Sequence, residues 1–360
     1  MKILFIVKTY HDGDKFFENK EDLFREKNFE EISEIFSKFY CIWLSEFYLL
    51  LKSHIDCKII FVNNLNLIKD ISCEKTKKKY FDYLNFIFND YNPDILISNT
   101  EDKNFLIKIK QSKSLRVLWK SSEPNKYNNI FDGELFDFII SDNINILQLA
   151  DLNKIKNSFL LASVPERCLN KKNFSSRKDK LFFSGSLSYQ HSDRREIVKS
   201  LIKKKIDLEV RSRDIKDYNI FFEKINQIVP FKRYDKNSIS NFTKKPIFGI
   251  ELLNYMSNFK FILNNHSKFD KDYAINYRVF ESLASGCLLF TDQNKKLDNY
   301  FIDEKHLITY KNKNDLVEKI NFYKNNENLA EELSGNGYDI IKQNHTSNIR
   351  LQEFKKILQI

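Results

Sequence analysis

Cysteine is scarce in this 360-residue chain, and its five cysteines are not arranged for cross-linking or for metal binding. They are far apart, none forms a C-x-x-C pair, and their number is odd. This pattern argues against a disulfide framework and against a zinc finger, and it is typical of a protein in a reducing compartment. We therefore expect a cytoplasmic protein.

Long apolar runs are also missing. The N-terminal run from Ile3 to Val7 is followed at once by Lys8, so it is too short for a signal peptide. The most apolar helical stretch, Cys41 to Leu51, contains Glu46 and is too short to span a bilayer. We expect no membrane span, and any membrane contact is expected to be peripheral, at the inner face.

Several common site motifs do not occur. The chain has no G-x-G-x-x-G, Walker loop, H-E-x-x-H, EF-hand spacing or G-x-S-x-G. Its six histidines are isolated from one another, so we expect no metal site. The formal net charge is +10, which favours anionic partners such as nucleotide diphosphates, acidic glycans or an anionic membrane surface. The basic runs at 75–79 and 203–205 lack interleaved aromatic residues, so we expect no nucleic acid partner.

Apolar residues make up 42% of the chain, enough for two hydrophobic cores at this length. Strand-like and helix-like segments alternate along both halves. In the first half we predict strands at 2–7, 58–62, 93–97, 116–119, 136–140 and 158–162, and helices at 28–54, 77–89, 103–110 and from 143. In the second half we predict strands at 180–184, 208–211, 260–263, 287–291 and 307–310, and helices at 193–203, 249–259, 276–286, 314–325, 328–335 and from 346. This alternation is typical of two parallel sheets with helices on both faces.

The stretch 164–178 breaks the alternation, because it is polar and contains Pro165. We interpret it as an interdomain linker between domains at 1–163 and 179–345, with a C-terminal helix at 346–360. Two doubly wound, Rossmann-like domains joined in this way are expected to face each other across a cleft at the carboxyl ends of their strands.

The stretch 276–292 combines a short amphipathic helix with a buried strand. Asn276 is a candidate N-cap and Gly286 a candidate helix end. Free N–H groups at the helix start and the Arg278 guanidinium can hold a diphosphate, and Glu281 can take sugar hydroxyls. The alternative is an ordinary amphipathic helix whose Arg278 and Glu281 form a solvated ion pair.

A second candidate anion site follows the strand at 180–184. Gly185 permits close approach of an anion to the main chain, Ser186 adds a backbone amide, and Arg194 or Arg195 lies in the next helix. A single glycine after a strand is also found in ordinary turns, so the alternative is that this loop is an ordinary turn.

These segments together resemble a known family. The run Asn276–Gly286, N-Y-R-V-F-E-S-L-A-S-G, resembles the R-x-F-E-x-x-A-x-G signature of GT-B glycosyltransferases of the spore-maturation CgeB-like group. The residues Gly335–Tyr338, His345–Thr346 and Arg350 are similar to the closing G-Y…H-T…R pattern of that group. The resemblance covers the chain from about residue 180 to its end, and the first half is similar in topology only.

The resemblance implies glycosyl transfer from a nucleotide-diphosphate sugar, held by the second domain, to a glycan, lipid-linked or other acceptor held mainly by the first. Cell-surface polysaccharide biosynthesis would be one setting. It implies no cofactor beyond the donor and no metal, because arginine and the helix start would supply the positive charge. The implied donor site comprises Gly185, Ser186, Arg195, Asn276, Tyr277, Arg278, Glu281 and Ser282, with Arg278 and Glu281 also catalytic and with Arg278 and Arg195 as phosphate clamps.

The stereochemical course is the least constrained implication. Glu281 matches the second Glu of the E-x7-E pattern of related retaining enzymes, but the position eight residues earlier is Tyr273. Asp270 and Asp272 are candidates to replace the missing carboxylate. We expect a retaining enzyme. The alternatives are an inverting, fucosyltransferase-like enzyme, suggested by the loop 270–273, and a GT-B-shaped binding protein without turnover.

In the first domain, His11 is the candidate catalytic base, with Asp12 and Glu123 as further candidates for contact with the acceptor. All three lie in expected loops at the strand edge. The alternative is that they are ordinary turn residues.

Overall fold

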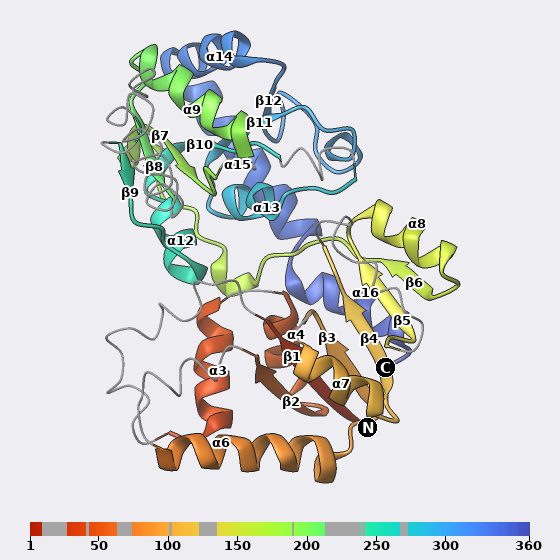
Figure 1. Cartoon of the computed structure of the whole chain (residues 1–360). Helices are drawn as coiled ribbons and strands as arrows, with labels where there is room; N and C mark the ends of the chain where they lie inside the picture. The colour runs from red at the N-terminus through yellow and green to blue at the C-terminus, as the bar shows by residue number, and fades with distance from the viewer. Residues whose placement is uncertain are drawn as a thin grey trace, which may run out of the picture. The chain divides into compact units, whose positions relative to one another are not determined.

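The computed structural model shows two compact units, drawn in Figure 1. Unit 1 comprises Met1–Pro165 and Ser347–Ile360, and unit 2 comprises Glu166–Thr346. The structure describes residues 1–8, 27–40, 43–62, 74–100, 103–121, 135–188, 191–212, 239, 242–266 and 273–360.

A six-stranded parallel sheet forms the centre of unit 1. Its strands, in the spatial order β2-β1-β3-β4-β5-β6, are β2 (Asp56–Phe61), β1 (Lys2–Val7), β3 (Ile95–Ser98), β4 (Leu115–Trp119), β5 (Phe138–Ser141) and β6 (Lys156–Phe159). The order reverses between β1 and β3. In open α/β sheets such a reversal marks the usual place for a ligand.

Helices cover both faces of this sheet (Figure 1). The helices of one face are α6 (Glu74–Phe86), α7 (Lys103–Gln111) and α8 (Ile144–Leu152), and those of the other are α3 (Phe29–Tyr40), α4 (Trp43–Leu51) and α16 (Ser347–Leu358). On the second face the ring of Phe36 packs edge-on against Phe61. Phe354 of α16 contacts both Phe47 and Trp119, so the C-terminal helix is part of the core of unit 1.

Unit 2 contains a second six-stranded parallel sheet. Its strands, in the spatial order β12-β11-β10-β7-β8-β9, are β12 (Ile308–Tyr310), β11 (Leu288–Asp292), β10 (Phe259–Leu263), β7 (Lys178–Ser184), β8 (Leu208–Arg211) and β9 (Thr243–Lys244). Here the order reverses between the neighbours β7 and β10. The carboxyl ends of these two strands are therefore the expected ligand edge.

Helices also pack on both faces of the second sheet. They are α9 (Ser192–Lys203), α12 (Gly249–Met256), α13 (Tyr277–Ala284), α14 (Lys313–Asn325) and α15 (Glu327–Asn344). Apolar side chains of α9, α14 and α15 join those of β7, β10 and β11 in one buried cluster. The prediction of two parallel sheets with flanking helices is confirmed.

Element boundaries differ from the predictions in several places. The single helix predicted at 28–54 is two helices, α3 and α4. The strand predicted at 158–162 is β6, which begins at Lys156 and ends at Phe159. The helix predicted to end at Gly335 continues to Asn344, because packing overrides the poor helix propensity of glycine. A Cβ at Gly337 would lie 2.4 Å from the carbonyl oxygen of His306, so this contact requires a glycine.

The stretch 164–178 is folded from Glu166 onward as part of unit 2. Two 3₁₀ turns, Glu166–Cys168 and Phe174–Ser176, bury Cys168 and Phe174. Arg177 is 6% exposed, and its guanidinium donates to the carbonyl oxygens of Ser285 at 3.2 Å and of Gly286. These bonds satisfy carbonyls at the end of α13, so the polar composition of this stretch reflects a helix contact.

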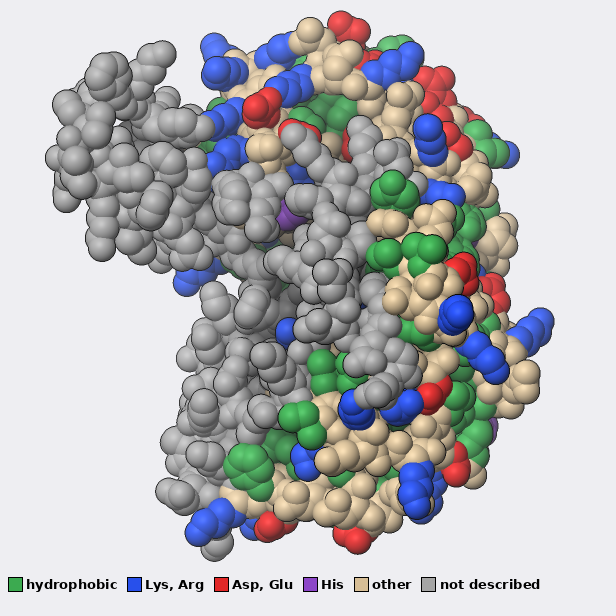
Figure 2. Space-filling view, turned by 45° about the vertical axis from the view of Figure 1, so that its right-hand side comes forward, with side chains coloured by type: hydrophobic (Ala, Val, Ile, Leu, Met, Phe, Trp, Pro, Cys, Tyr) green, Lys and Arg blue, Asp and Glu red, His purple; other side chains and the backbone are tan. Residues whose placement is uncertain are grey.

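Lysine and arginine side chains are scattered among other types on the face shown in Figure 2. No single basic patch stands out among the described side chains on that face. None of the described helices is both long and apolar enough to cross a membrane.

Candidate functional site

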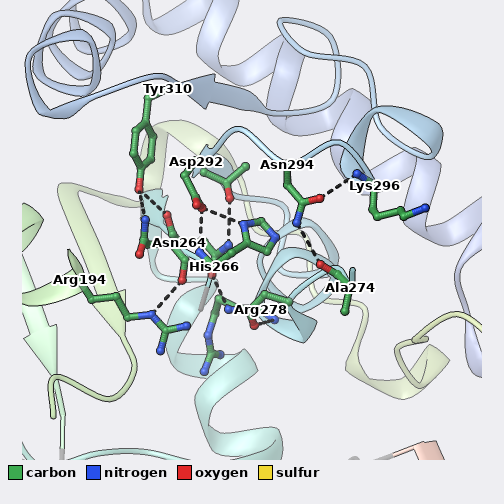
Figure 3. A network of polar contacts seen from close by, with 12 residues as sticks. Arg194, Asn264, His266, Ala274, Arg278, Asp292, Asn294, Lys296 and Tyr310 are labelled. Carbon is green, nitrogen blue, oxygen red and sulfur yellow. Dashed lines mark hydrogen bonds and ion pairs between the residues drawn. The ribbon is translucent and has the colours of Figure 1, made fainter. Parts of the chain in front are cut away.

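Buried polar side chains gather at the carboxyl edge of the second sheet, at the reversal between β7 and β10. The three residues directly after β10, Asn264, Asn265 and His266, are 2%, 8% and 4% exposed. Asn294, which follows β11, is 4% exposed. Polar groups are buried only where hydrogen bonds compensate for lost water. The polar side chains at this edge therefore form a hydrogen-bonded network (Figure 3).

A chain of side-chain hydrogen bonds connects the sheet to the start of α13. Asn264 Nδ2 donates to Thr291 Oγ1 at 2.9 Å, and Asn276 Nδ2 donates to Asn264 Oδ1 at 3.0 Å. Asn276 is also the N-cap, and its Oδ1 accepts from the backbone N–H of Arg278 at 3.0 Å. The cap thus holds the helix start against β10 and β11. The predicted capping role of Asn276 agrees with this geometry.

Tyr310 and Arg194 hold the loop after β10 from two other elements. Tyr310, at the end of β12, donates its hydroxyl to the carbonyl oxygen of Asn264 at 3.0 Å and accepts from Asn265 Nδ2 at 3.2 Å. Arg194 of α9 donates from Nε to the carbonyl oxygen of Asn265 at 2.9 Å. Burial raises the pKa of Tyr310 well above its ordinary value, so this hydroxyl stays protonated at neutral pH.

His266 and Asp292 form a second enclosed pair of the cluster. Asp292 Oδ1 accepts from the backbone N–H of His266 and from its ring Nδ1, both at 2.8 Å. The two side chains are 1% and 7% exposed. The carboxylate therefore fixes the orientation of the imidazole.

Arg278 and Glu281 are paired one turn apart on α13, with 2.6 Å between Arg278 Nη1 and Glu281 Oε2. Their side chains are only 18% and 11% exposed, so the alternative of a solvated surface pair does not describe them. Burial raises the pKa of Glu281, and the nearby Arg278 guanidinium opposes that rise. A buried carboxyl with a raised pKa beside an arginine is a candidate functional group.

The other residues predicted for the donor site have local partners. Gly185 N–H donates to the carbonyl oxygen of Arg211 at 3.2 Å, as part of the sheet edge. Ser186 Oγ donates to Ser188 Oγ at 3.2 Å, and Arg195 Nε donates to the carbonyl oxygen of Leu187 at 3.1 Å. Arg194 is thus the arginine of α9 that reaches the loop after β10, and Arg195 holds the loop before its own helix.

Tyr277 is half-buried at the first position of α13, and Ser282 is fully buried. Ser282 Oγ donates back to the carbonyl oxygen of Arg278 at 2.7 Å. The structure thus brings Asn276, Arg278 and Glu281 together at one helix start. The roles of all the predicted site residues stay predictions.

Other candidates fall outside the described residues. They are His11, Asp12, Glu123, Asp270 and Asp272. Tyr273 is described and is 40% exposed. Within the described part of the chain, no group of three His, Cys, Asp or Glu side chains could hold a metal ion.

Sequence reasoning did not single out Asn264, Asp292 and Tyr310. A usable signal was present, because each follows or ends a predicted buried strand at the same sheet edge. Their mutual distances depend on strand order, which the sequence did not specify.

Part of the chain, including these residues, is similar to a known protein family. Residues 194–356 match the family described as glycosyl transferase-like. No curated protein matches the chain.

Solved structures match the whole chain at low identity. One is HepE from Anabaena in complex with UDP and glucose, at 9% identity and a TM-score of 0.62, covering 100% of this chain and 99% of that one. Another is an alpha-glucosyltransferase in complex with UDP-glucose and DNA containing an abasic site, at 13% identity and a TM-score of 0.63, covering 100% of both chains. A third is a glycosyltransferase from Rickettsia africae, at 13% identity and a TM-score of 0.61, covering 99% and 97%. The chain therefore has the GT-B fold, and its residues 194–356 are similar to the glycosyl transferase-like family.

Proposed function

We propose that this protein transfers a sugar from a nucleoside-diphosphate sugar, bound by unit 2, to an acceptor. The observation that carries the proposal is the start of α13. There an asparagine cap bonded to the sheet edge holds the positive end of the helix beside Arg278 and Glu281. Helix starts with a neighbouring guanidinium bind phosphate groups well. HepE and the alpha-glucosyltransferase were solved with UDP or UDP-glucose, which favours a uridine diphosphate sugar.

The chemistry follows from where charge develops. Breaking the bond between the anomeric carbon and the diphosphate oxygen leaves negative charge on the diphosphate. The positive end of the α13 helix and the Arg278 guanidinium would stabilise this charge without rearranging. Glu281, which resembles the ribose-contacting carboxylate of related enzymes, would accept from donor hydroxyls.

We infer three finer properties from the resemblance. The transfer is retaining, and it needs no metal because arginine and the helix start supply the positive charge. Membership of the CgeB-like group is the third property. Product stereochemistry determined by NMR checks the first, and activity after treatment with EDTA checks the second. An inverted product would support the fucosyltransferase-like alternative.

The proposed acceptor is a glycan or lipid-linked glycan made at the cytoplasmic face of the membrane, as in cell-surface polysaccharide biosynthesis. The net charge of +10 supports docking to an acidic glycan or an anionic surface. Such docking predicts that the protein shifts from membrane to soluble fractions as salt is raised. Partition that does not respond to salt would contradict electrostatic docking.

The direct test is binding of nucleotide sugars by isothermal titration calorimetry, with Arg278→Ala as the site variant. Removing one preorganised charge donor of this kind costs about 3 kcal/mol in the transition state, or roughly a hundredfold in rate. Lys313→Ala is the matched control, because it removes one positive charge from an exposed ion pair of the same unit.

We expect the control to bind and turn over the donor like the wild type, while Arg278→Ala loses most of both. Circular dichroism checks that each variant is folded. Equal activity of Arg278→Ala and wild type would show that α13 is not the donor site. Tight nucleotide binding without transfer or hydrolysis would instead support the binding-protein alternative.

A further inference from the structure

The imidazole of His266 has one ring nitrogen without a partner inside an otherwise satisfied network. The neighbouring amides of Asn264, Asn276 and Asn294 all donate to oxygen atoms within 3.0 Å. His266 Nε2 is buried and has no hydrogen-bond partner in the described part of the chain. A buried polar atom left unpaired lowers the stability of the fold. An unpaired atom at the ligand edge of a sheet indicates that a ligand supplies the partner.

The hydrogen bond to Asp292 determines what kind of partner Nε2 can take. A carboxylate only accepts hydrogen bonds, so the ring nitrogen that faces it, Nδ1, carries the proton. In a neutral imidazole Nε2 is then an acceptor. An acceptor matches a hydroxyl group and does not match a phosphate oxygen.

We propose that His266 Nε2 accepts a hydrogen bond from a sugar hydroxyl of the bound donor, either on its ribose or on the transferred sugar. This inference rests on the proposed function, and it assigns His266 a positioning role with no proton transfer. Figure 3 shows the imidazole between Asp292 and the loop that carries Ala274. Asn264, two residues before His266, accepts a hydrogen bond from Asn276 and so holds the start of α13. A hydroxyl bound here would therefore be placed relative to the phosphate-binding helix start.

Two substitutions separate this contact from a structural role. His266→Asn keeps an N–H donor at the position of Nδ1, so it preserves the bond to Asp292, but it removes the acceptor at Nε2. His266→Gln carries an amide oxygen at the position of Nε2 and loses the bond to Asp292. If His266 has only a structural role, His266→Gln should lower the melting temperature. Neither variant should then weaken donor binding by more than the loss of folded protein explains.

The experiment measures the Kd of UDP and of UDP-glucose by calorimetry for wild type and both variants. We expect His266→Asn to weaken donor binding about three- to tenfold with an unchanged melting temperature, and His266→Gln to keep more of the affinity. Weakening of both probes assigns the ribose hydroxyl, and weakening of UDP-glucose alone assigns the transferred sugar. Wild-type affinity for both probes in His266→Asn overturns this inference alone. A wild-type protein that binds neither probe, nor any other nucleotide sugar, overturns the proposed function and this inference with it.

Discussion

Replacing Glu281 with glutamine separates function from stability in this site. The substitution keeps the shape of the side chain and an oxygen facing Arg278, but it removes the negative charge. If Glu281 is held here for the donor, the neutral variant loses donor affinity without losing stability. If the residue is a structural ion-pair partner, the variant loses stability instead.

The sign of the stability change follows from the pKa of Glu281. Burial raises this pKa above its ordinary value, and the attraction of Arg278 only partly offsets the rise. A carboxyl whose folded-state pKa is raised adds most to the free energy of unfolding when the pH is below its unfolded-state pKa. This contribution is lost as the pH rises through the folded-state pKa. At neutral pH the Glu281 carboxyl therefore lowers the free energy of unfolding relative to acidic pH.

Removing one partner of a fully buried ion pair usually costs about 3–5 kcal/mol, because the other charge stays buried without a counter-charge. Here Arg278 retains 18% side-chain exposure and an amide oxygen as its partner, so we expect removal of the buried Glu281 charge to outweigh this loss and to stabilise the fold by about 1 kcal/mol. For a unit of this size that raises the melting temperature by about 2–4 °C. Calorimetric scans of wild type and Glu281→Gln at pH 4 and pH 7 measure the difference, which should appear only at the higher pH.

The control is Glu318→Gln, the same chemical change at an exposed position of α14, for which we expect no shift at either pH. The donor Kd of Glu281→Gln, measured on the same samples, should rise at least tenfold. A Glu281→Gln protein that melts several degrees lower at pH 7, and binds the donor normally, would refute the reasoning.

Three further predictions concern residues of unit 2 that pack around the candidate site. Gly337→Ala should lower stability by about 1–3 kcal/mol in thermal melts, because its Cβ meets the carbonyl oxygen of His306, whereas Gly335→Ala in the same helix should be neutral or stabilising. Asn276→Ala should lower stability by about 1 kcal/mol and weaken donor binding, while Asn276→Asp, which keeps the cap, should lose less stability. Burial raises the pKa of Cys287 to about 12, so iodoacetamide should label it at pH 8 only after denaturation, as mass spectrometry of the labelled peptide can show.

The regular alternation of strands and helices made the fold predictable. Most strands of both sheets are short apolar runs, and their alternation with helices predicts two parallel sheets. The prediction failed where a boundary depended on tertiary contact. Arg177 sits in a polar stretch that looks like a linker, yet its guanidinium binds carbonyls at the end of a helix more than a hundred residues later in the chain.

The site was predictable only where its residues are close in sequence. Asn276, Arg278 and Glu281 lie on one helix turn, so spacing alone placed them together. The partners Asn264 and Thr291 come from two different strands, and only the sheet order makes them neighbours. Arg194 and Arg195 are adjacent in sequence, and their local hydrogen bonds determine which one reaches the loop after β10.

The hydrogen bonds from Thr291 through Asn264 to Asn276 hold the α13 start in place, as the proposed donor site requires. A donor group stabilises developing charge best when it does not have to move during the reaction. An N-cap on a surface helix is anchored only by its own turn, whereas Asn276 is also bonded to Asn264 at the end of a central strand. Breaking the link at Asn264 should therefore lower the turnover rate more than it lowers the fraction of folded protein, because it releases the helix start while leaving the apolar face of α13 packed.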